Sequence, residues 1–261
     1  MQATARQQFL NDYAKIRMAE GRGSDDPAYY RALPYRDLTG KNSEQWLIRA
    51  RSYRYFETKI LGKRPLDILD LGAGNCWMSY RLALRQHRPV ALDIFADGAD
   101  GLAAARHYPT PFHRVEAEYD RLPFESGRFD LVIYNSSIHY SSDYGRTLAE
   151  ARRVLRPQGR AVIMDSPIYR EREHGELMRS ERHAYFEQTY GFRSDHLESI
   201  EYFDYLMLQQ LSRDLRIRWE VHRPWLGLAW HLRPWKARLR GTRPPSRFWI
   251  LVARFQPRLQ Q

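Results

Sequence analysis

The chain has 261 residues, which is long enough to bury the core of one α/β domain with additional segments. Its formal charge is +11, and only five of its 42 basic residues are lysines, so nucleic acid, an anionic lipid surface or an acidic ligand would be attracted to it. Cys76 is the only cysteine, which excludes an internal disulfide and a cysteine metal cluster. No run approaches the ~18 apolar residues of a membrane-spanning helix, and residues 1–10 contain no signal-like apolar segment, so we expect a cytoplasmic protein.

Residues 1–60 are rich in tyrosine and arginine and precede the first clear strand. A helix is predicted over 43–60, and Gly62 and Pro65 would end it. We expect the region to form a helical lid over the turn that follows the first strand. Four of its side chains could contact a ligand there or could simply pack or face solvent: Tyr30, Tyr35, Trp46 and Arg49.

A short apolar run, 66–71, leads directly into two glycines and then into a helix-like stretch, 77–85. Without a Cβ, Gly72 and Gly74 let the backbone approach a ligand, and the N–H groups at the helix start face that ligand. A second apolar run contains Asp93, which lies 21 residues after Gly72, close to the spacing at which a second-strand acid reaches a ribose. The same residues could instead form only a tight turn and a helix cap.

Short apolar runs continue to alternate with helix-like stretches as far as residue 165. The strands are predicted at 66–71, 90–94, 129–135 and 161–165, with a helix over 144–155 between the last two. Continuous apolar strands separated by helices indicate a Rossmann-like, doubly wound α/β fold with three layers and a mostly parallel sheet. Ligands of such sheets bind at the carboxyl ends of the strands, where Gly72, Asp93, Asn135 and Asp165 would converge.

The last hundred residues contain a helical region and two more strands. Residues 169–211 have a helical, charge-rich pattern, and their histidines lack the spacing of metal ligands, so a solvated helix is expected and no metal site. Strands are predicted at 215–221 and 248–255. Tryptophans alternate with arginines between them, which is typical of a membrane or nucleic-acid surface, or of a helix packed on the sheet with its arginines in water.

Residues 66–165 resemble the class I S-adenosylmethionine-dependent methyltransferases, in particular those that act on small molecules. The resemblance implies an antiparallel last strand. It also implies that the first motif and the ribose acid, Asp93, bind the cofactor, while an acid in the segment 116–124 meets the adenine. The cofactor residues by this resemblance are Asp70, Gly72, Ala73, Gly74, Asn75, Asp93, Ile94, Glu118, Tyr119 and Asn135. Many relatives have a third glycine where this chain has Cys76, which would narrow the space beside the methionine part of the cofactor.

The residue types support this cofactor independently, because adenosylmethionine needs an acid for its ribose hydroxyls, a close backbone for its amino-acid end and partners for adenine. A dinucleotide would require a third glycine at position 77, which is tryptophan. The chain is therefore divided into a helical lid (1–60), a cofactor-binding core (61–168), a substrate-side helical insertion (169–213) and a C-terminal strand pair with an Arg/Trp-rich connection (214–261).

The expected reaction is transfer of a methyl group from S-adenosylmethionine to a small-molecule acceptor, with S-adenosylhomocysteine as the product. If the acceptor must lose a proton, His139 after the fourth strand is the candidate base, and Tyr140 could orient it or the substrate. Two alternatives remain. The arginine-rich tail could bind RNA for a nucleic-acid methyltransferase, or the chain could bind the cofactor without turnover. Contact with an anionic lipid surface is also open, and the sequence does not identify the acceptor.

Overall fold

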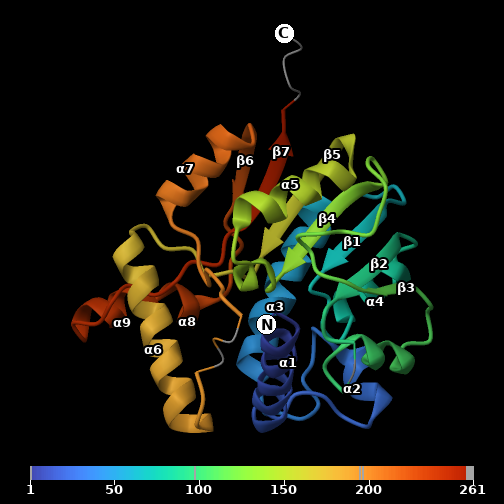
Figure 1. Cartoon of the computed structure of the whole chain (residues 1–261). Coiled ribbons are helices and arrows are strands. Elements are labelled where there is room, and N and C mark those ends of the chain that lie inside the picture. Colours follow the sequence, from blue (N-terminus) through green and yellow to red (C-terminus); the bar gives the residue numbers. More distant parts are fainter. Residues whose placement is uncertain (1, 97, 194, 196, 257–261) are drawn as a thin grey trace.

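The computed structural model describes residues 2–96, 98–193, 195 and 197–256, and its centre is one seven-stranded sheet (Figure 1). The strand order is β3-β2-β1-β4-β5-β7-β6, and only β7 runs antiparallel to its neighbours. The strands are β1 Asp67–Leu71, β2 Arg88–Asp93, β3 His113–Glu116, β4 Phe129–Asn135, β5 Leu155–Met164, β6 Ile217–His222 and β7 Ile250–Phe255. The predicted mostly parallel sheet with an antiparallel last strand is confirmed.

Helices cover both faces of this sheet, which confirms the three-layer α/β/α arrangement (Figure 1). The α-helices are α1 Gln2–Ala19, α2 Pro27–Ala32, α3 Ser43–Phe56, α4 Trp77–Leu84, α5 Tyr144–Val154, α6 Arg172–Tyr190, α7 Tyr205–Asp214, α8 Leu228–His231 and α9 Arg233–Leu239. Alternate residues of the central strands supply the two cores. Ile68 and Ile133 pack under α3 and α4, while Leu69 and Val132 pack under α5 and α7.

Local sequence sets the ends of these elements. The Asp143 carboxylate accepts the Arg146 N–H at 3.0 Å and caps α5, and the Asp204 carboxylate accepts the Met207 N–H at 2.7 Å and caps α7. The predicted helix over 43–60 is α helical to Phe56 and continues as one π turn, Glu57–Leu61. The helical pattern over 169–211 resolves into α6 and the first part of α7, and Leu211 of α7 is buried against the sheet.

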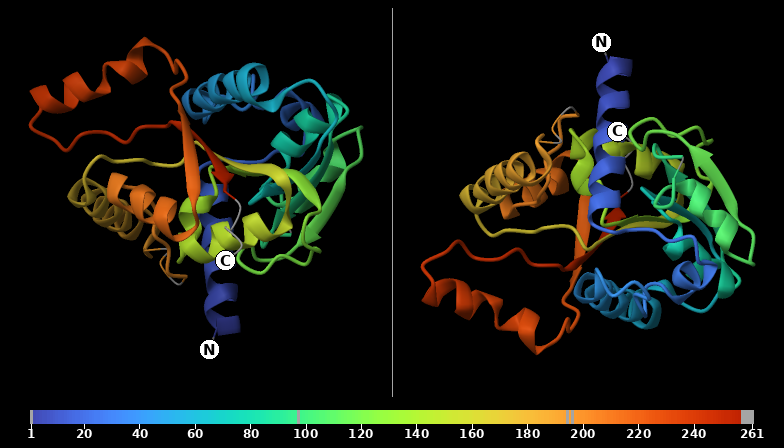
Figure 2. Two further views of the ribbon diagram at one scale, coloured as in Figure 1. Left: turned by 90° about the horizontal axis from the view of Figure 1, so that it is seen from above. Right: turned by 90° about the horizontal axis from the view of Figure 1, so that it is seen from below.

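The connection between β6 and β7 does not pack on the sheet, which was one of the alternatives that the sequence left open. It extends away from the sheet as a hairpin that carries α8 and α9 (Figure 2). Trp235 and Leu239 of α9 are mostly exposed. In the described part of the chain, no helix is long and apolar enough to cross a membrane.

Candidate functional site

The glycine turn after β1 is joined directly to the acid at the end of β2. Gly72 has φ +71°, and a Cβ on it would lie 2.3 Å from the Ser137 Cβ, so a side chain has no room there. Gly74 has φ +50°, and its N–H donates to the Asp93 Oδ2 atom at 2.8 Å. The backbone of the predicted motif therefore holds the predicted ribose acid in place.

Asp93 has a second backbone donor, since the Phe95 N–H reaches its Oδ1 atom at 2.9 Å. Burial raises the pKa of Asp93, although the N–H groups of Phe95 and Gly74 oppose the rise by stabilising the charged form. The side chain remains partly accessible. The acid is thus oriented by two backbone groups and still has lone pairs for a ligand.

Asp70 lies under this turn and is almost fully buried. Its Oδ2 atom accepts a hydrogen bond from the Ser79 hydroxyl at 2.7 Å. Burial raises the pKa of Asp70 to about 7, against the opposing effect of Ser79, and the nearby Asp93 raises it further. A ligand that carries positive charge would stabilise the ionised form of this acid.

Cys76 adopts the left-handed conformation, with φ 63°, immediately before α4. Glycine adopts this conformation without the strain that a Cβ causes. The thiol is fully buried in the core under α4 and lines neither of the two cavities at the turn. The expected narrowing of the cofactor space by this side chain is therefore wrong, because the side chain points into the core.

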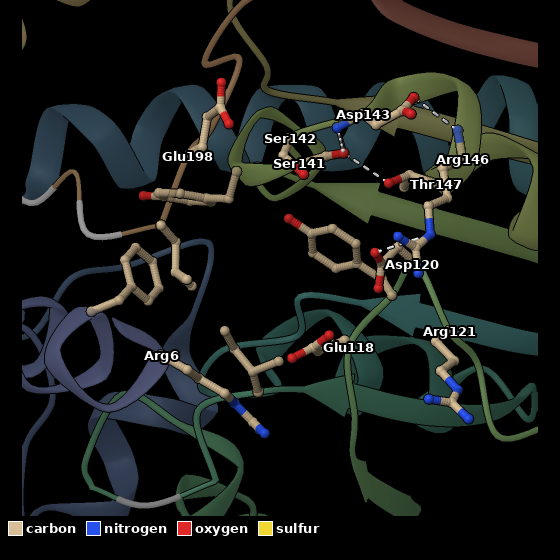
Figure 3. Close-up of a pocket in the computed structure, with 15 residues that line it drawn as sticks. Arg6, Glu118, Asp120, Arg121, Ser141, Ser142, Asp143, Arg146, Thr147 and Glu198 are labelled. Atoms are coloured by element: carbon tan, nitrogen blue, oxygen red, sulfur yellow. Dashed lines mark hydrogen bonds and ion pairs between the residues drawn. The ribbon is translucent and has the colours of Figure 1, made fainter. Parts of the chain in front are cut away.

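A cavity of about 570 Å³ opens beside the ends of β2 and β4 (Figure 3). Ile94, Glu118 and Tyr119, all predicted to bind the cofactor, line it together with Tyr140. Glu118 is exposed and faces the cavity opposite Ser141 and Ser142. The remaining residues that line this cavity are Arg6, Phe9, Asp120, Arg121, Asp143, Arg146, Thr147, Leu197 and Glu198.

A second cavity, of about 50 Å³, lies directly over the glycine turn. It is lined by six of the residues predicted to bind the cofactor, namely Asp70, Gly72, Ala73, Gly74, Asn75 and Asn135. The Asn135 Oδ1 atom is buried without a hydrogen-bond partner among the described residues. A buried acceptor of this kind is expected to be satisfied by a bound donor or water.

Tyr13, Arg17 and Asp100 also line the small cavity, and the sequence did not single them out. The Asp100 carboxylate accepts the Asn75 side-chain N–H at 2.9 Å, and it lies 2.5 Å from the Arg17 Nε atom. Burial alone would lower the pKa of Arg17, but the charges of Asp100, Tyr13, Tyr140 and Glu20 together outweigh burial and raise this pKa. The pair therefore fixes a charged guanidinium beside the glycine turn.

Helix α1 brings Arg17 to this place and contributes residues to the lining of both cavities. Phe9 and Tyr13 each lie 6.3 Å from Tyr140 between ring centroids, and Tyr13 lies 5.4 Å from Phe95. The signal in the sequence is the spacing of Phe9, Tyr13 and Arg17 by four residues, which places all three on one helix face. No clear apolar periodicity accompanies it, which is why the helix was not predicted.

The four expected lid contacts divide into two pairs. Trp46 and Arg49 of α3 line the small cavity, with the guanidinium 4.8 Å from the indole centroid. Tyr30 and Tyr35 lie away from both cavities. Tyr30 stacks on the His107 ring at 4.4 Å, and Tyr35 is exposed beneath the Arg81 guanidinium.

The predicted base, His139, lies in the short 3₁₀ turn after β4. Its Nδ1 atom is 3.3 Å from the Ser166 hydroxyl, which in turn donates to the Met164 carbonyl at 3.4 Å. Burial lowers the pKa of His139 to about 3, and the positive charges of Arg182 and Arg49 act in the same direction. The imidazole is therefore neutral near pH 7. Tyr140 contacts it, with ring centroids 4.6 Å apart.

Asp165 is a buried acid at the end of β5. Its position at the carboxyl ends of the strands was predicted, but no role was assigned to it. It accepts a hydrogen bond from the Ser52 hydroxyl at 2.6 Å, and its Oδ2 atom has no partner in the described part of the chain. Burial raises its pKa to about 6, opposed by Ser52 and by the charge of Arg49. Ser52 and Asp165 thereby connect α3 to the sheet.

The charged insertion residues form ion pairs rather than a metal site. Within the described residues, no group of three histidine, cysteine or carboxylate side chains is arranged to hold an ion. Glu201 is buried between Arg182 and His183, at 2.7 Å from each. The Glu201 N–H also donates to the His139 carbonyl at 2.8 Å, so this ion-pair group positions the His139 turn.

The sequence and the fold both match known proteins. Residues 69–163 match a family described as "Methyltransferase domain". A malonyl-[acyl-carrier protein] O-methyltransferase of Geobacter sulfurreducens is 34% identical over 152 residues, which are 57% of this chain and 51% of that protein. A demethylmenaquinone methyltransferase of Thermus thermophilus is 35% identical over 114 residues, which are 41% of this chain and 50% of that protein. The chain thus matches about half the length of each of these relatives.

Solved structures share the fold at lower sequence identity. A 1,6-didemethyltoxoflavin-N1-methyltransferase of Burkholderia thailandensis, crystallised with S-adenosylhomocysteine, has a TM-score of 0.52 and 18% identity, covering 85% of this chain and 83% of that one. A putative methyltransferase of Haloferax volcanii, in complex with the activator Trm112, has a TM-score of 0.59 and 15% identity, covering 84% of this chain and 96% of that one. These likenesses concern the fold.

Proposed function

We propose that this protein belongs to the class I S-adenosylmethionine-dependent methyltransferases and transfers a methyl group from S-adenosylmethionine to a small-molecule acceptor; the match of residues 69–163 to a methyltransferase-domain family and the shared fold support this. The observation that carries the proposal is the 2.8 Å hydrogen bond from Gly74 to Asp93. It fixes the acid at the glycine turn, where Gly74 lines the cavity of about 50 Å³ and Ile94, the residue after Asp93, lines the cavity of about 570 Å³. An elongated nucleoside with an amino-acid tail needs this combination.

The residues present fit the chemistry of that cofactor. Its sulfonium and ammonium groups are cationic, and the pKa values of the buried Asp70 and the partly buried Asp93, which burial raises, would fall when a cation lies nearby. Its carboxylate would pair with Arg17, whose Nε atom lies beside Asp100 and whose guanidinium has further N–H groups. The unpartnered Asn135 oxygen would accept from the ammonium group.

We assign the parts of the cofactor to the residues accordingly. Asp93 would hold the ribose hydroxyls, and Ile94, Glu118 and Tyr119 would line the adenine. The methionine end would lie against the glycine turn, which comprises Gly72, Ala73, Gly74 and Asn75, together with Arg17 and Asn135. In this assignment α1 is the lid, because Phe9 and Tyr13 pack on Tyr140 across the space between the cavities.

When bound, the cofactor supplies an electrophilic methyl group, so the chain has to align the acceptor, exclude water and remove a proton where one is lost. His139 can accept that proton. The Ser166 hydroxyl donates to the Met164 carbonyl and so accepts the His139 Nδ1–H, which leaves Nε2 with a free lone pair. Burial lowers its pKa to about 3, so the imidazole is neutral throughout the neutral range but is a weaker base than an exposed histidine, and it suits an acceptor whose own proton is acidic.

The acceptor is proposed only as a small molecule. The relatives are named for two different acceptors, a malonyl group on an acyl-carrier protein and demethylmenaquinone. Residues that would distinguish such acceptors lie outside the matched 69–163, in α1, α3 and the insertion from residue 169 onwards. The insertion is assigned to the acceptor side because Glu201 holds the His139 turn.

The proposal is tested by calorimetric titration of the protein with S-adenosylmethionine and S-adenosylhomocysteine. Asp93→Ala should weaken both affinities by ~1–3 kcal/mol, because hydrogen bonds to a charged acceptor are lost. His139→Gln is the matched variant from the same site. It should bind the cofactor normally while its turnover with any accepted substrate falls by about 10²–10⁴-fold.

Unchanged cofactor affinity in Asp93→Ala would remove that acid from the ribose site. Failure of the wild-type protein to bind either molecule would refute the assignment. Normal cofactor binding without methylation of any tested acceptor would instead favour a binding protein that does not catalyse transfer.

A further inference from the structure

The segment between β6 and β7, residues 223–247, forms a protrusion that we call the basic hairpin. It contains α8 and α9, and both views in Figure 2 show it extending away from the sheet and from the other helices. Nothing in the proposed methyl-transfer site uses its side chains. The hairpin therefore requires a separate explanation.

The helices of the hairpin expose an apolar ridge. Leu228, Leu232, Trp235 and Leu239 are spaced by four, three and four residues, so they lie along one helical face. Their exposed fractions are 65%, 41%, 70% and 85%. Trp225, before α8, is 62% exposed and stacks on the His231 ring at 4.1 Å. Large apolar side chains gathered on one exposed face mark a surface that meets another apolar phase or a partner.

Positive charge accompanies the ridge throughout. The sequence from residue 221 to its end at 261 contains no aspartate or glutamate. Lys236, Arg238 and Arg240 alternate with the ridge residues of α9, are exposed, and form no ion pair with any residue that the structure describes. These three cations are available to an external anion.

The base of the hairpin is fixed to the domain. The Arg51 guanidinium of α3 donates to the Leu226 carbonyl, and a Cβ on Gly227 would collide with that guanidinium, so this turn packs tightly on α3. On the returning side, Arg243 pairs with Glu181 of α6 at 2.7 Å. The ridge is consequently presented in a set orientation. Helix α3 also carries Trp46 and Arg49 of the small cavity.

We propose that the basic hairpin docks this protein on the surface of an anionic lipid bilayer. The ridge would enter the boundary between headgroups and acyl chains, and the three free cations would contact lipid phosphates. Tryptophan suits this boundary because its ring is apolar and its N–H is polar. A second copy of the chain would bring the same positive charge to the ridge, and a nucleic acid would leave three leucines in water.

The test is flotation of the full-length protein with phosphatidylcholine vesicles that contain or lack phosphatidylglycerol. The wild-type protein should float with the anionic vesicles, and far less with the neutral ones. Leu232→Ser/Trp235→Ser/Leu239→Ser and Lys236→Gln/Arg238→Gln/Arg240→Gln should each lower binding by about 10–100-fold, by removing the apolar and the electrostatic contribution respectively. Leu206→Ser, at a leucine of α7 that is 61% exposed, is the control and should bind as wild type.

Unchanged S-adenosylhomocysteine affinity in both triple variants, or an unchanged urea midpoint, would establish that they are folded. Three results would overturn the proposal: no flotation of the folded wild-type protein, loss of binding in the charge variant alone with an equal loss of RNA binding, or a wild-type dimer that the apolar variant abolishes without any effect on vesicles. The vesicle result does not depend on methyl transfer, so it stands or fails separately from the proposed function.

Discussion

Charged side chains lie in buried surroundings at the carboxyl edge of the sheet, whereas they are exposed on the basic hairpin. At the edge, Asp70, Asp93 and Asp165 are acids in buried surroundings, and each accepts a hydrogen bond from a hydroxyl or a backbone N–H at 2.6–2.9 Å. On the hairpin, cations and large apolar side chains are exposed, and the described structure gives three of the cations no ion pair. The edge is organised around contacts inside the chain, whereas the hairpin is shaped for contacts outside it.

If the carboxyl edge of the sheet depends on contacts within the chain, a small substitution there should strongly lower the free energy of unfolding. Gly72→Ala should lower the free energy of unfolding by roughly 2–5 kcal/mol, because the new methyl group would both clash with Ser137 and occupy a left-handed backbone. Urea denaturation measures this change. Gly127→Ala is a matched control, since Gly127 has the same φ of +71° but no atom within 4 Å of the new Cβ.

The control should lower the stability by only about 1 kcal/mol, the cost of the backbone conformation alone. Equal losses in the two variants would contradict the tight packing of the glycine turn against Ser137.

The buried acids should also impose a pH dependence on stability. Asp70 has a pKa of about 7 in the folded chain and an ordinary value near 3.8 when unfolded, so the folded state holds the proton more tightly. Its contribution to stability is present below about pH 4 and is lost as the pH rises to about 7. Asp70→Asn keeps an oxygen for Ser79 and removes this titration. At pH 8 the variant should be more stable than wild type by roughly 1–4 kcal/mol.

Urea denaturation of both proteins between pH 4 and pH 8 gives the difference curve. Asp165 titrates in both proteins and cancels from the difference, which therefore reports Asp70 together with its electrostatic coupling to Asp93. A difference that stays constant across this range would show that Asp70 is ionised in the folded protein at all of these pH values.

Substitutions on the hairpin should change the free energy of unfolding least. Leu232→Ser/Trp235→Ser/Leu239→Ser should change the free energy of unfolding by no more than about 0.5 kcal/mol per site, because exposed side chains without internal contacts contribute little. Thermal unfolding of the wild-type protein and the variant in the absence of lipid measures this difference. A loss as large as that expected for Gly72→Ala would mean that the ridge packs within the molecule, and the contrast between the two regions would disappear.

The sequence predicted the elements whose signals are local. Continuous apolar runs located the central strands, and the predicted run 129–135 coincides with β4. The glycines and Asp93 were brought together as predicted, because a parallel βαβ unit places the end of its second strand beside the turn after its first. Glu118 and Tyr119 lie at the larger cavity for the same reason, since β3 pairs with β2.

The parts that were not predicted depend on contacts between distant segments. Arg17 and Asp100 meet only in the folded chain, and neither belongs to a motif. Helix α1 has aromatic residues on one face but no apolar stripe, so its placement over the site follows from packing on Tyr140. The direction of the hairpin depends on the Arg51 and Arg243 contacts, which no periodicity encodes.

The central claim is that the glycine turn and Asp93 together hold a methyl-donating nucleoside. A crystal structure with S-adenosylhomocysteine tests it most directly. We expect both ribose hydroxyls on the Asp93 carboxylate, adenine beside Ile94 and Tyr119, and the amino-acid end over Gly72 and Gly74. Density for the molecule at another place on the chain, or a fully occupied ligand whose ribose does not contact Asp93, would contradict the claim.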